Sequence, residues 1–99
     1  MHIELASRAI KDLGSVDRDT RRRIRTGLEQ LENEGDNLDI AALSGRSPWR
    51  RLRVGEHRII FRPFTTSEAA SLNVERGYLI ARIVNRRDLH RAVANLPEP

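Results

Sequence analysis

The sequence predicts an α+β fold: a twisted, mainly antiparallel four-stranded sheet, with two N-terminal helices packed on one face and a short C-terminal helix. Three observations support this prediction. Apolar residues recur at helical spacing in the first third of the chain, alternate with polar residues in the middle, and return to helical spacing near the end. The predicted order is β-α-α-β-β-β-α. Because 99 residues leave room for one hydrophobic core, we expect a single domain over residues 1–99.

The first third of the chain predicts a short strand and two helices. Residues 2–5 alternate between polar and apolar side chains, as a strand does. Residues 6–13 carry apolar side chains at helical spacing. A second helix follows, with Asp17 or Ser15 at its start, because their side-chain oxygens can accept from unpaired backbone N–H groups. This helix is expected to continue to about Asn33.

An arginine-rich run, residues 18–25, lies on this second predicted helix and is interrupted by Asp19. Runs of charge on a helix are most often faces exposed to water. We therefore expect a solvated surface here rather than a functional site.

The middle of the chain predicts a β-hairpin. Residues 37–43 are short and mixed in character, and suggest one helical turn. Residues 49–54 and 57–64 alternate and predict two strands, joined by a tight turn at residues 55–56. The pattern therefore changes from helical to extended after the first 48 residues.

The last third predicts one strand and one helix. Residues 65–77 are polar and poorly patterned, so a loop or a frayed hairpin tip is expected. Residues 78–84 predict a strand that can bury either of two alternating sets, and we favour the set Leu79, Ala81 and Ile83. Residues 86–94 predict a short last helix, with Leu89 and Val93 on one side.

Strand alternation sorts the hairpin residues between two faces of the sheet. The expected core residues are Leu52, Val54, Ile59 and Phe61. The opposite face, which the helices leave open to solvent, is expected to carry Trp49, Arg51, Arg53, Arg58, Ile60, Arg62 and, from the next strand, Arg82. Core packing is the expected role for Trp49.

The positive charge of the chain is concentrated in its second half. Residues 46–91 hold eleven arginines and four acidic residues, a balance of +7, whereas residues 1–45 have a balance of −2. Like charges at neighbouring sheet positions repel one another, so an open face of this kind favours a bound anion. Phosphate is the commonest polyanionic partner. The competing explanations are a charged face kept for solubility and a codon bias toward arginine.

Other classes of protein receive little support. Cysteine is absent, which excludes disulfides and thiolate metal sites and fits a cytoplasmic protein. No stretch is long and apolar enough for a membrane helix, and residues 1–5 lack the pattern of a signal peptide. His2, His57 and His90 do not have metal-ligand spacing, so no metal and no cofactor are expected.

Two segments carry a resemblance to a known family. Residues 51–62, Arg-Leu-Arg-Val-Gly-Glu-His-Arg-Ile-Ile-Phe-Arg, resemble the central signature of the RelE/ParE toxin superfamily. Residues 83–91, Ile-Val-Asn-Arg-Arg-Asp-Leu-His-Arg, are similar to the second signature of that superfamily. Residues 43–45 match the Leu-x-Gly segment that precedes the hairpin in the superfamily. The predicted order of elements agrees with the fold of that superfamily over essentially the whole chain.

The resemblance implies the toxin of a type II toxin-antitoxin system, and in the RelE-like case a ribosome-dependent endoribonuclease. Such toxins enter the ribosomal A site and cut mRNA by attack of a 2′-hydroxyl on the adjacent phosphodiester, without a metal. On matching positions, Arg58 and Arg87 would face the scissile phosphate, and His90 would complete the catalytic set. The RNA-binding residues would be Arg51, Arg53, Arg62, Arg82 and Arg86.

The chain departs from the family pattern at three points. Arginines stand where relatives have lysines in the central strand, and arginine serves as a clamp because it does not readily transfer a proton near neutral pH. His90 stands where many relatives have tyrosine, and an imidazole can act as acid or base. His57 replaces an aromatic residue, and strand alternation directs it away from Arg58, so a structural role is expected.

The resemblance also implies a partner and leaves alternatives open. A cognate antitoxin, RelB-like or similar, would cover the basic face with an acidic segment, while mRNA in the ribosomal A site would be the substrate. A ParE-like inhibitor of DNA gyrase shares the fold without the catalytic residues. A third hypothesis is an inactive homologue that acts only as an antitoxin-binding module.

Overall fold

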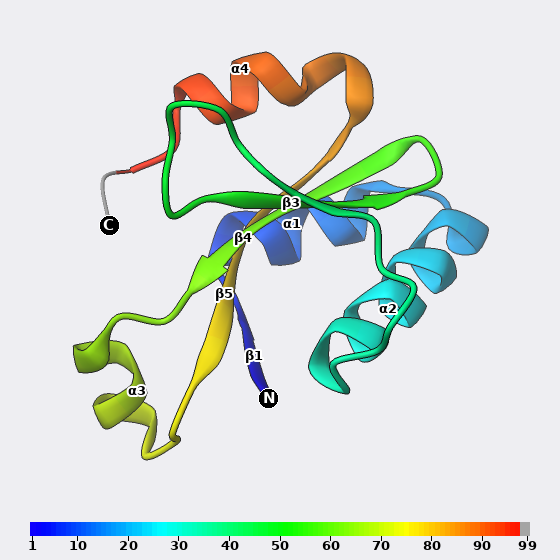
Figure 1. Ribbon diagram of the computed structural model, residues 1–99. Coiled ribbons are helices and arrows are strands. Elements are labelled where there is room, and N and C mark those ends of the chain that lie inside the picture. Colours follow the sequence, from blue (N-terminus) through cyan, green and yellow to red (C-terminus); the bar gives the residue numbers. More distant parts are fainter. Residues whose placement is uncertain (98–99) are drawn as a thin grey trace.

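The computed structural model describes residues 1–97 and has an α+β fold built on a five-stranded sheet (Figure 1). Its elements are β1 (His2–Leu5), α1 (Ser7–Ser15), α2 (Arg18–Glu32), β2 (Ile40–Ala42), β3 (Arg50–Val54), β4 (His57–Pro63), α3 (Thr66–Leu72), β5 (Gly77–Asn85), a 3₁₀ turn (Arg86–Asp88) and α4 (Leu89–Ala94). The strand order is β1-β5-β4-β3-β2. All neighbouring strands are antiparallel except β1, which runs parallel to β5. The last two residues of the predicted domain, 98–99, lie outside the described residues.

The two N-terminal helices form as the sequence predicts. Asp17 caps α2 by accepting a hydrogen bond from the backbone N–H of Thr20 at 2.7 Å. Arg21 of α2 donates to the backbone carbonyls of Leu13, Gly14 and Val16 at the end of α1. Carbonyls at a helix C-terminus have no partner within the helix, so this one guanidinium both satisfies them and ties the two helices together.

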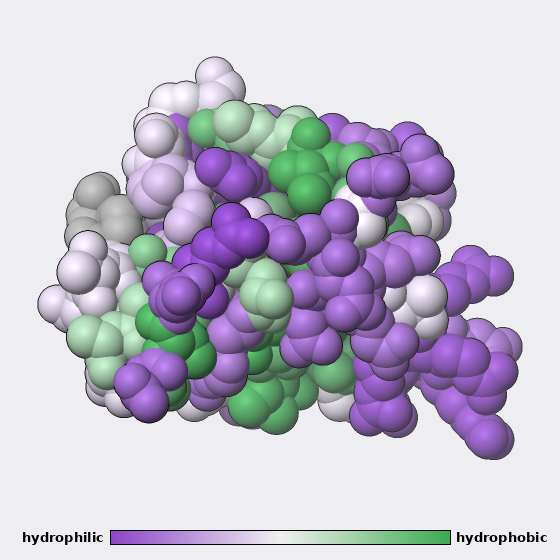
Figure 2. Space-filling model, turned by 60° about the horizontal axis from the view of Figure 1, so that its bottom comes forward, coloured by the Kyte–Doolittle hydropathy of each residue, from purple (hydrophilic) through white to green (hydrophobic). Residues whose placement is uncertain are grey.

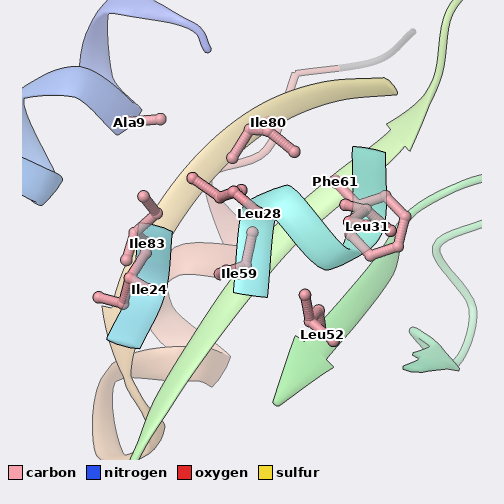
Figure 3. Packing of buried hydrophobic residues seen from close by; sticks show 9 residues of the cluster. All are labelled: Ala9, Ile24, Leu28, Leu31, Leu52, Ile59, Phe61, Ile80 and Ile83. Atoms are coloured by element: carbon pink, nitrogen blue, oxygen red, sulfur yellow. The ribbon is translucent and has the colours of Figure 1, made fainter. Parts of the chain in front are cut away.

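The main hydrophobic core lies between these helices and one face of the sheet (Figure 3). Its buried members are Ala9, Ile24, Leu28, Leu31, Leu52, Ile59, Phe61, Ile80 and Ile83. Gly27 allows α2 to approach β3 closely, because a Cβ built there would lie 2.8 Å from Cγ2 of Val54. The predicted core residues of the hairpin are confirmed, with Leu52 and Ile59 almost fully buried and Val54 packed against them.

Two segments differ from the sequence-based prediction. Residues 40–42 form the edge strand β2 rather than a helical turn, and pair with β3 in the register Ile40 to Leu52. Pairing there satisfies backbone groups that β3 would otherwise leave unpaired, a tertiary requirement that local composition does not express. Residues 66–72 form α3 rather than a loop, so the fold has one strand and one helix more than predicted.

The helix α3 begins with a capping box. The Thr65 hydroxyl accepts from the backbone N–H of Glu68 at 3.2 Å, and the Glu68 carboxylate accepts from the backbone N–H of Thr65 at 2.8 Å. Asn73 ends the helix in the left-handed conformation, with φ at 55°. Both signals stand in the sequence, so this helix could have been predicted.

The favoured core set of the last strand is right for Ile83, which lies in the main core, and wrong for Leu79 and Ala81, which do not. Ile60 pairs with Arg82 and Phe61 pairs with Ile80, so Ala81 is an extra residue, a β-bulge. The bulge exchanges the two faces midway along β5. Ile80 and Ile83 therefore both lie in the main core, while Ala81 faces the other side.

That other side of the sheet is only partly open. Figure 1 shows α4 lying across one end of it, away from α3. A second buried cluster forms beneath α4, made of Trp49, Ile60, Ala81, Val84 and Ala92. Arg46, from the loop before β3, donates a hydrogen bond to the backbone carbonyl of Val93 and so links this loop to α4. The expectation of an open second face therefore holds only at the hairpin end of β3 and β4.

None of the helices within residues 1–97 is both long enough and apolar enough to span a membrane.

Candidate nucleic-acid interface

The hairpin of β3 and β4 gathers arginines at the uncovered end of the second sheet face. Arg53 and Arg58 are direct partners across the two strands, and Arg51 lies two residues back on the same face of β3. At the end of β5, the backbone N–H of Arg86 donates to the Glu56 carbonyl at 2.8 Å, which joins this strand end to the hairpin turn. We call Arg51, Arg53, Arg58 and Arg86 the arginine cluster.

Two carboxylates offset part of this charge. Asp39 Oδ1 lies 3.2 Å from Arg51 Nη1, and its Oδ2 lies 4.0 Å from Arg53 Nη1. Glu56 Oε2 lies 2.8 Å from Arg86 Nε, in a pair with both side chains largely exposed. Ion pairs this exposed to water are weak, so a competing anion can replace them. Sequence reasoning missed Asp39, because it lies outside the strand pattern.

Arg58 is the least neutralised member of the cluster. Its Nη1 donates to the carbonyls of Gly55 and His57 at 3.1 and 3.0 Å, and no carboxylate of residues 1–97 lies within 4.0 Å of it.

Partial burial lowers the pKa of Arg58 below its ordinary value, and the positive charges of Arg53, Arg51 and Arg86 lower it further, against the opposing effect of Glu56. The guanidinium is still charged near neutral pH, but its charged form is disfavoured by its neighbours. An anion placed among these side chains would relieve that repulsion.

Two further predicted residues follow directly after β5. Arg87 lies exposed in the 3₁₀ turn. The backbone N–H of Arg87 donates to Asn85 Oδ1 at 3.1 Å, and this hydrogen bond caps the start of the turn. His90 lies exposed in the first turn of α4. The turn therefore brings both residues to the same end of the sheet as the arginine cluster.

The helix α4 turns His90 away from a hollow beside it. That hollow, of about 670 Å³, is lined by Arg91 and Ala92 of α4, by Asn95 just after the helix, and on the other side by the start of α1 and by β5. With 3.6 residues per turn, His90 lies on the opposite flank of α4 from these three residues.

Arg62 does not join the cluster. It is buried, and its Nη1 and Nη2 donate to the two carboxylate oxygens of Glu68 at 2.7 and 3.0 Å. Its guanidinium carbon also lies 5.4 Å from the centre of the Trp49 ring. The prediction that Arg62 is exposed on an open face is therefore wrong, because α3 and Trp49 cover it.

The ion pair with Arg62 strongly changes the acidity of Glu68. The hydrogen bonds from Arg62 and from the Thr65 backbone hold the pKa of Glu68 at about 2, below its ordinary value of 4.5.

Arg82 does not join the cluster either. Its Nε donates to Asp12 Oδ2 at 2.8 Å, and the same carboxylate oxygen accepts from the backbone N–H of Ile83 at 2.9 Å. Beyond the end of β1, Asp12 thus accepts a hydrogen bond from the free backbone N–H at the edge of β5, and Arg82 holds the Asp12 carboxylate in place. Arg82 lies on the predicted second face, since it pairs with Ile60 of the second cluster, but the ion pair with Asp12 holds its side chain away from the arginine cluster.

The remaining sequence-based expectations near the site concern His57 and Trp49. The pKa of Asp17, at the start of α2, is lowered mainly by hydrogen bonds from Thr20 and slightly by His57. His57 pairs with Val54, which packs against the main core, so His57 lies on the helix side of the sheet, as alternation predicts, away from Arg58. Trp49 is 3% exposed and packs in the second cluster, which confirms its core position.

This arrangement offers charge and hydrogen-bond donors rather than a metal site. Within residues 1–97, no three His, Cys, Asp or Glu side chains gather closely enough to hold a metal ion. Guanidinium groups present planar forks that fit phosphate oxygens, and several of them here converge on one exposed surface. The surface can therefore bind a phosphodiester and stabilise extra negative charge on it.

Comparison with known proteins supports the fold assignment. No protein-family model matches the sequence, and no curated protein matches it significantly. Among solved structures, the chain is similar to a chain of the RelB-RelE antitoxin-toxin complex from Methanococcus jannaschii, with a TM-score of 0.65, 23% identity, and coverage of 89% of this chain and 95% of that one.

A chain of the archaeal RelE-RelB complex from Pyrococcus horikoshii is also similar, with a TM-score of 0.62, 20% identity, and coverage of 85% and 92%. Both matches cover nearly the full length of the two chains compared. The chain therefore has the RelE fold.

Proposed function

We propose that this protein is the toxin of a toxin-antitoxin pair, and that it inhibits translation by cutting mRNA in the ribosomal A site. The observation that carries this proposal is the arginine cluster, which lies at the surface of a RelE fold with Arg53 and Arg86 exposed, and in which no carboxylate of residues 1–97 forms an ion pair with half-buried Arg58. A protein that used this face only for solubility would gain more from mixed charges than from arginines that repel one another.

The proposed reaction is a transesterification within the RNA. The 2′-oxygen of one nucleotide forms a bond to the adjacent phosphorus, and the bond from phosphorus to the 5′-oxygen of the next nucleotide breaks. A base takes the proton from the 2′-hydroxyl, and an acid gives a proton to the departing 5′-oxygen. Negative charge accumulates on the phosphorane in between, and positive groups around it lower the barrier.

The arginines supply that positive charge in this proposal. Arg58 and Arg87 would face the scissile phosphate, and Arg51, Arg53 and Arg86 would hold the flanking backbone. Arginine does not exchange a proton readily near neutral pH, so these groups bind and stabilise but do not act as base or acid. Asp39 and Glu56 would release their arginines to the RNA as it arrives, because both pairs are exposed.

His90 is the proposed proton-transfer group. It stands exposed in the first turn of α4, shortly after Arg86 and Arg87, on the flank of α4 away from the neighbouring hollow. An imidazole can serve as base in one half of the reaction and as acid in the other. Its exposure leaves it free to reach a bound RNA strand.

The proposed partner is an antitoxin with an acidic segment. The two solved relatives come from RelB-RelE complexes, so a protein of RelB type is the model for that partner. Acidic side chains on such a segment would pair with the arginine cluster and exclude RNA from it.

The proposal is tested by adding the purified chain to ribosomes that translate a defined mRNA. We expect cleavage within the A-site codon and none of the same mRNA free in solution. Arg58→Gln should abolish cleavage, and Arg76→Gln serves as the matched control because Arg76 is exposed and pairs with Glu34 far from the cluster. Absence of cleavage, together with inhibition of DNA gyrase, would replace this proposal with the ParE-like reading.

A further inference from the structure

A second group of arginines lies on α2, on the opposite side of the sheet from the arginine cluster. Arg18, Arg22 and Arg25 recur at i, i+4 and i+7 and are exposed along one face of the helix. Together with Arg21 they line a shallow groove of about 400 Å³. Figure 2 shows hydrophilic side chains gathered on the side of the molecule where α2 lies in Figure 1. We call Arg18, Arg22 and Arg25 the α2 stripe.

Among the described residues, the α2 stripe forms no ion pair with a carboxylate. No Asp or Glu of residues 1–97 lies within 4.0 Å of these three guanidinium groups. Three other exposed arginines have such partners, since Arg8 pairs with Asp12, Arg76 with Glu34 and Arg91 with Asp88, whereas exposed Arg23 and Arg87 form no ion pair within residues 1–97. Arg21, between the stripe residues, is used structurally at the end of α1.

The position of the stripe also opposes the stability of its own helix. The N-terminus of a helix carries partial positive charge, so cations there are unfavourable and anions are favourable. All arginines of α2 fall in its first half, its last turn contains no basic residue, and its acidic residues Glu29 and Glu32 lie near the C-terminal end. Asp17 and Asp19 offset this only in the first turn. A codon bias toward arginine does not explain why the arginines lie near the N-terminus of α2 and the glutamates near its C-terminus, the reverse of the placement that the helix dipole favours.

We propose that the α2 stripe binds the phosphate backbone of double-helical RNA. Guanidinium forks match phosphate oxygens, and the stripe extends about 10 Å along the helix axis. Single-stranded RNA is usually held by stacking its bases on aromatic side chains, and the stripe has none. The choice of RNA over DNA rests on the proposed function.

The two basic surfaces would then have separate tasks. The helices cover one face of the sheet, and the arginine cluster occupies the hairpin end of the other. The chain could therefore hold a structured RNA through α2 while a single strand lies against the cluster. Such a second contact would position the toxin on a large RNA-containing target without taking part in cleavage.

The test measures binding of the full chain to a blunt RNA duplex by fluorescence anisotropy over a range of salt concentrations. The variant replaces Arg18, Arg22 and Arg25 with glutamine. The control replaces Arg8, Arg76 and Arg91 with glutamine, which removes the same charge from exposed arginines elsewhere. Each lost phosphate contact lowers the salt slope by about one, so the stripe variant should lose about three and bind at least about tenfold more weakly.

Several outcomes would overturn the proposal. They are an equal loss of duplex binding in variant and control, an unchanged affinity in the stripe variant, or tighter binding of a DNA duplex of the same sequence. Stripe-dependent binding of polyglutamate without binding of RNA would identify an acidic protein partner instead. Folding is checked by urea unfolding, where the stripe variant should be at least as stable as the parent because unfavourable charge has been removed.

A further variant separates this proposal from the proposed function. Arg58→Gln should abolish ribosome-dependent cleavage yet leave duplex binding intact. Loss of duplex binding in Arg58→Gln would place the duplex on the arginine cluster and overturn the role of α2. Absence of cleavage by the parent, with stripe-dependent duplex binding retained, would refute the nuclease alone.

Discussion

The pair of buried Arg62 and half-buried Glu68 gives a prediction that separates a structural arginine from an RNA-binding one. We predict that Glu68→Gln destabilises the fold near neutral pH. Glutamine keeps an acceptor for the Thr65 backbone N–H, since the capping box tolerates either residue, and keeps one acceptor for Arg62. The substitution therefore removes charge with little change of shape.

The magnitude follows from the pKa of Glu68, about 2 against an ordinary value of 4.5. At about 1.4 kcal/mol per pKa unit, the upper limit is roughly 3.5 kcal/mol. The Glu68 side chain is 34% exposed, so screening by water reduces the expected loss to about 1–2 kcal/mol. Burial of Arg62, whose Nε has no partner among the described residues, favours the higher end of that range.

The same reasoning fixes the dependence on pH. A carboxylate whose pKa is lowered by folding stabilises the protein fully above its unfolded pKa, and this contribution disappears as pH falls through the folded pKa. The difference between parent and Glu68→Gln should thus be complete above about pH 5 and less than half as large at about pH 3.

Urea unfolding followed by circular dichroism at both pH values measures this difference. Equal midpoints at neutral pH, or a difference that does not shrink in acid, would refute the reasoning.

Three further predictions concern the site and its support. Arg87→Ala should abolish growth inhibition while the unfolding midpoint stays unchanged, and full toxicity would remove Arg87 from the site. His90→Ala should lower the cleavage rate by about 10²–10⁴-fold, and Arg91→Ala, one residue along on α4, should leave it unchanged; equal rates for both would assign His90 to structure. Trp49→Ala should destabilise the fold by about 3–5 kcal/mol in urea unfolding, since Trp49 is 3% exposed, and a loss below about 1 kcal/mol would contradict its core role.

The parts of the fold that sequence predicts well are those specified by local patterns. The hairpin is an example, because alternation alone separates Leu52 and Ile59 from Arg53 and Arg58. Prediction fails at β5 because the bulge at Ala81 breaks the alternation, and nothing in the residue types marks a bulge. It fails at β2 because that strand exists only to pair with β3.

The candidate site shows the same division. Charge and resemblance locate the arginine cluster, since its members share one strand face or follow a strand end. Arg62 and Arg82 have the same residue type and the same apparent face, yet each is paired with a carboxylate from a distant or overlooked element. Only the tertiary structure shows that Arg62 forms an ion pair with Glu68 and that Arg82 forms one with Asp12.

The parallel pairing of β1 with β5 has a consequence for how the chain is made. The strand β1 pairs only with β5, which follows all the other described strands in the sequence, since His2 pairs with Gly77 and Leu5 with Ile80. A chain emerging from the ribosome therefore cannot complete its sheet, or bring Arg86 to the hairpin, until almost all of it has been translated. Under the proposed function, an incomplete copy would therefore lack the assembled arginine cluster and would not act on the ribosome that is making it.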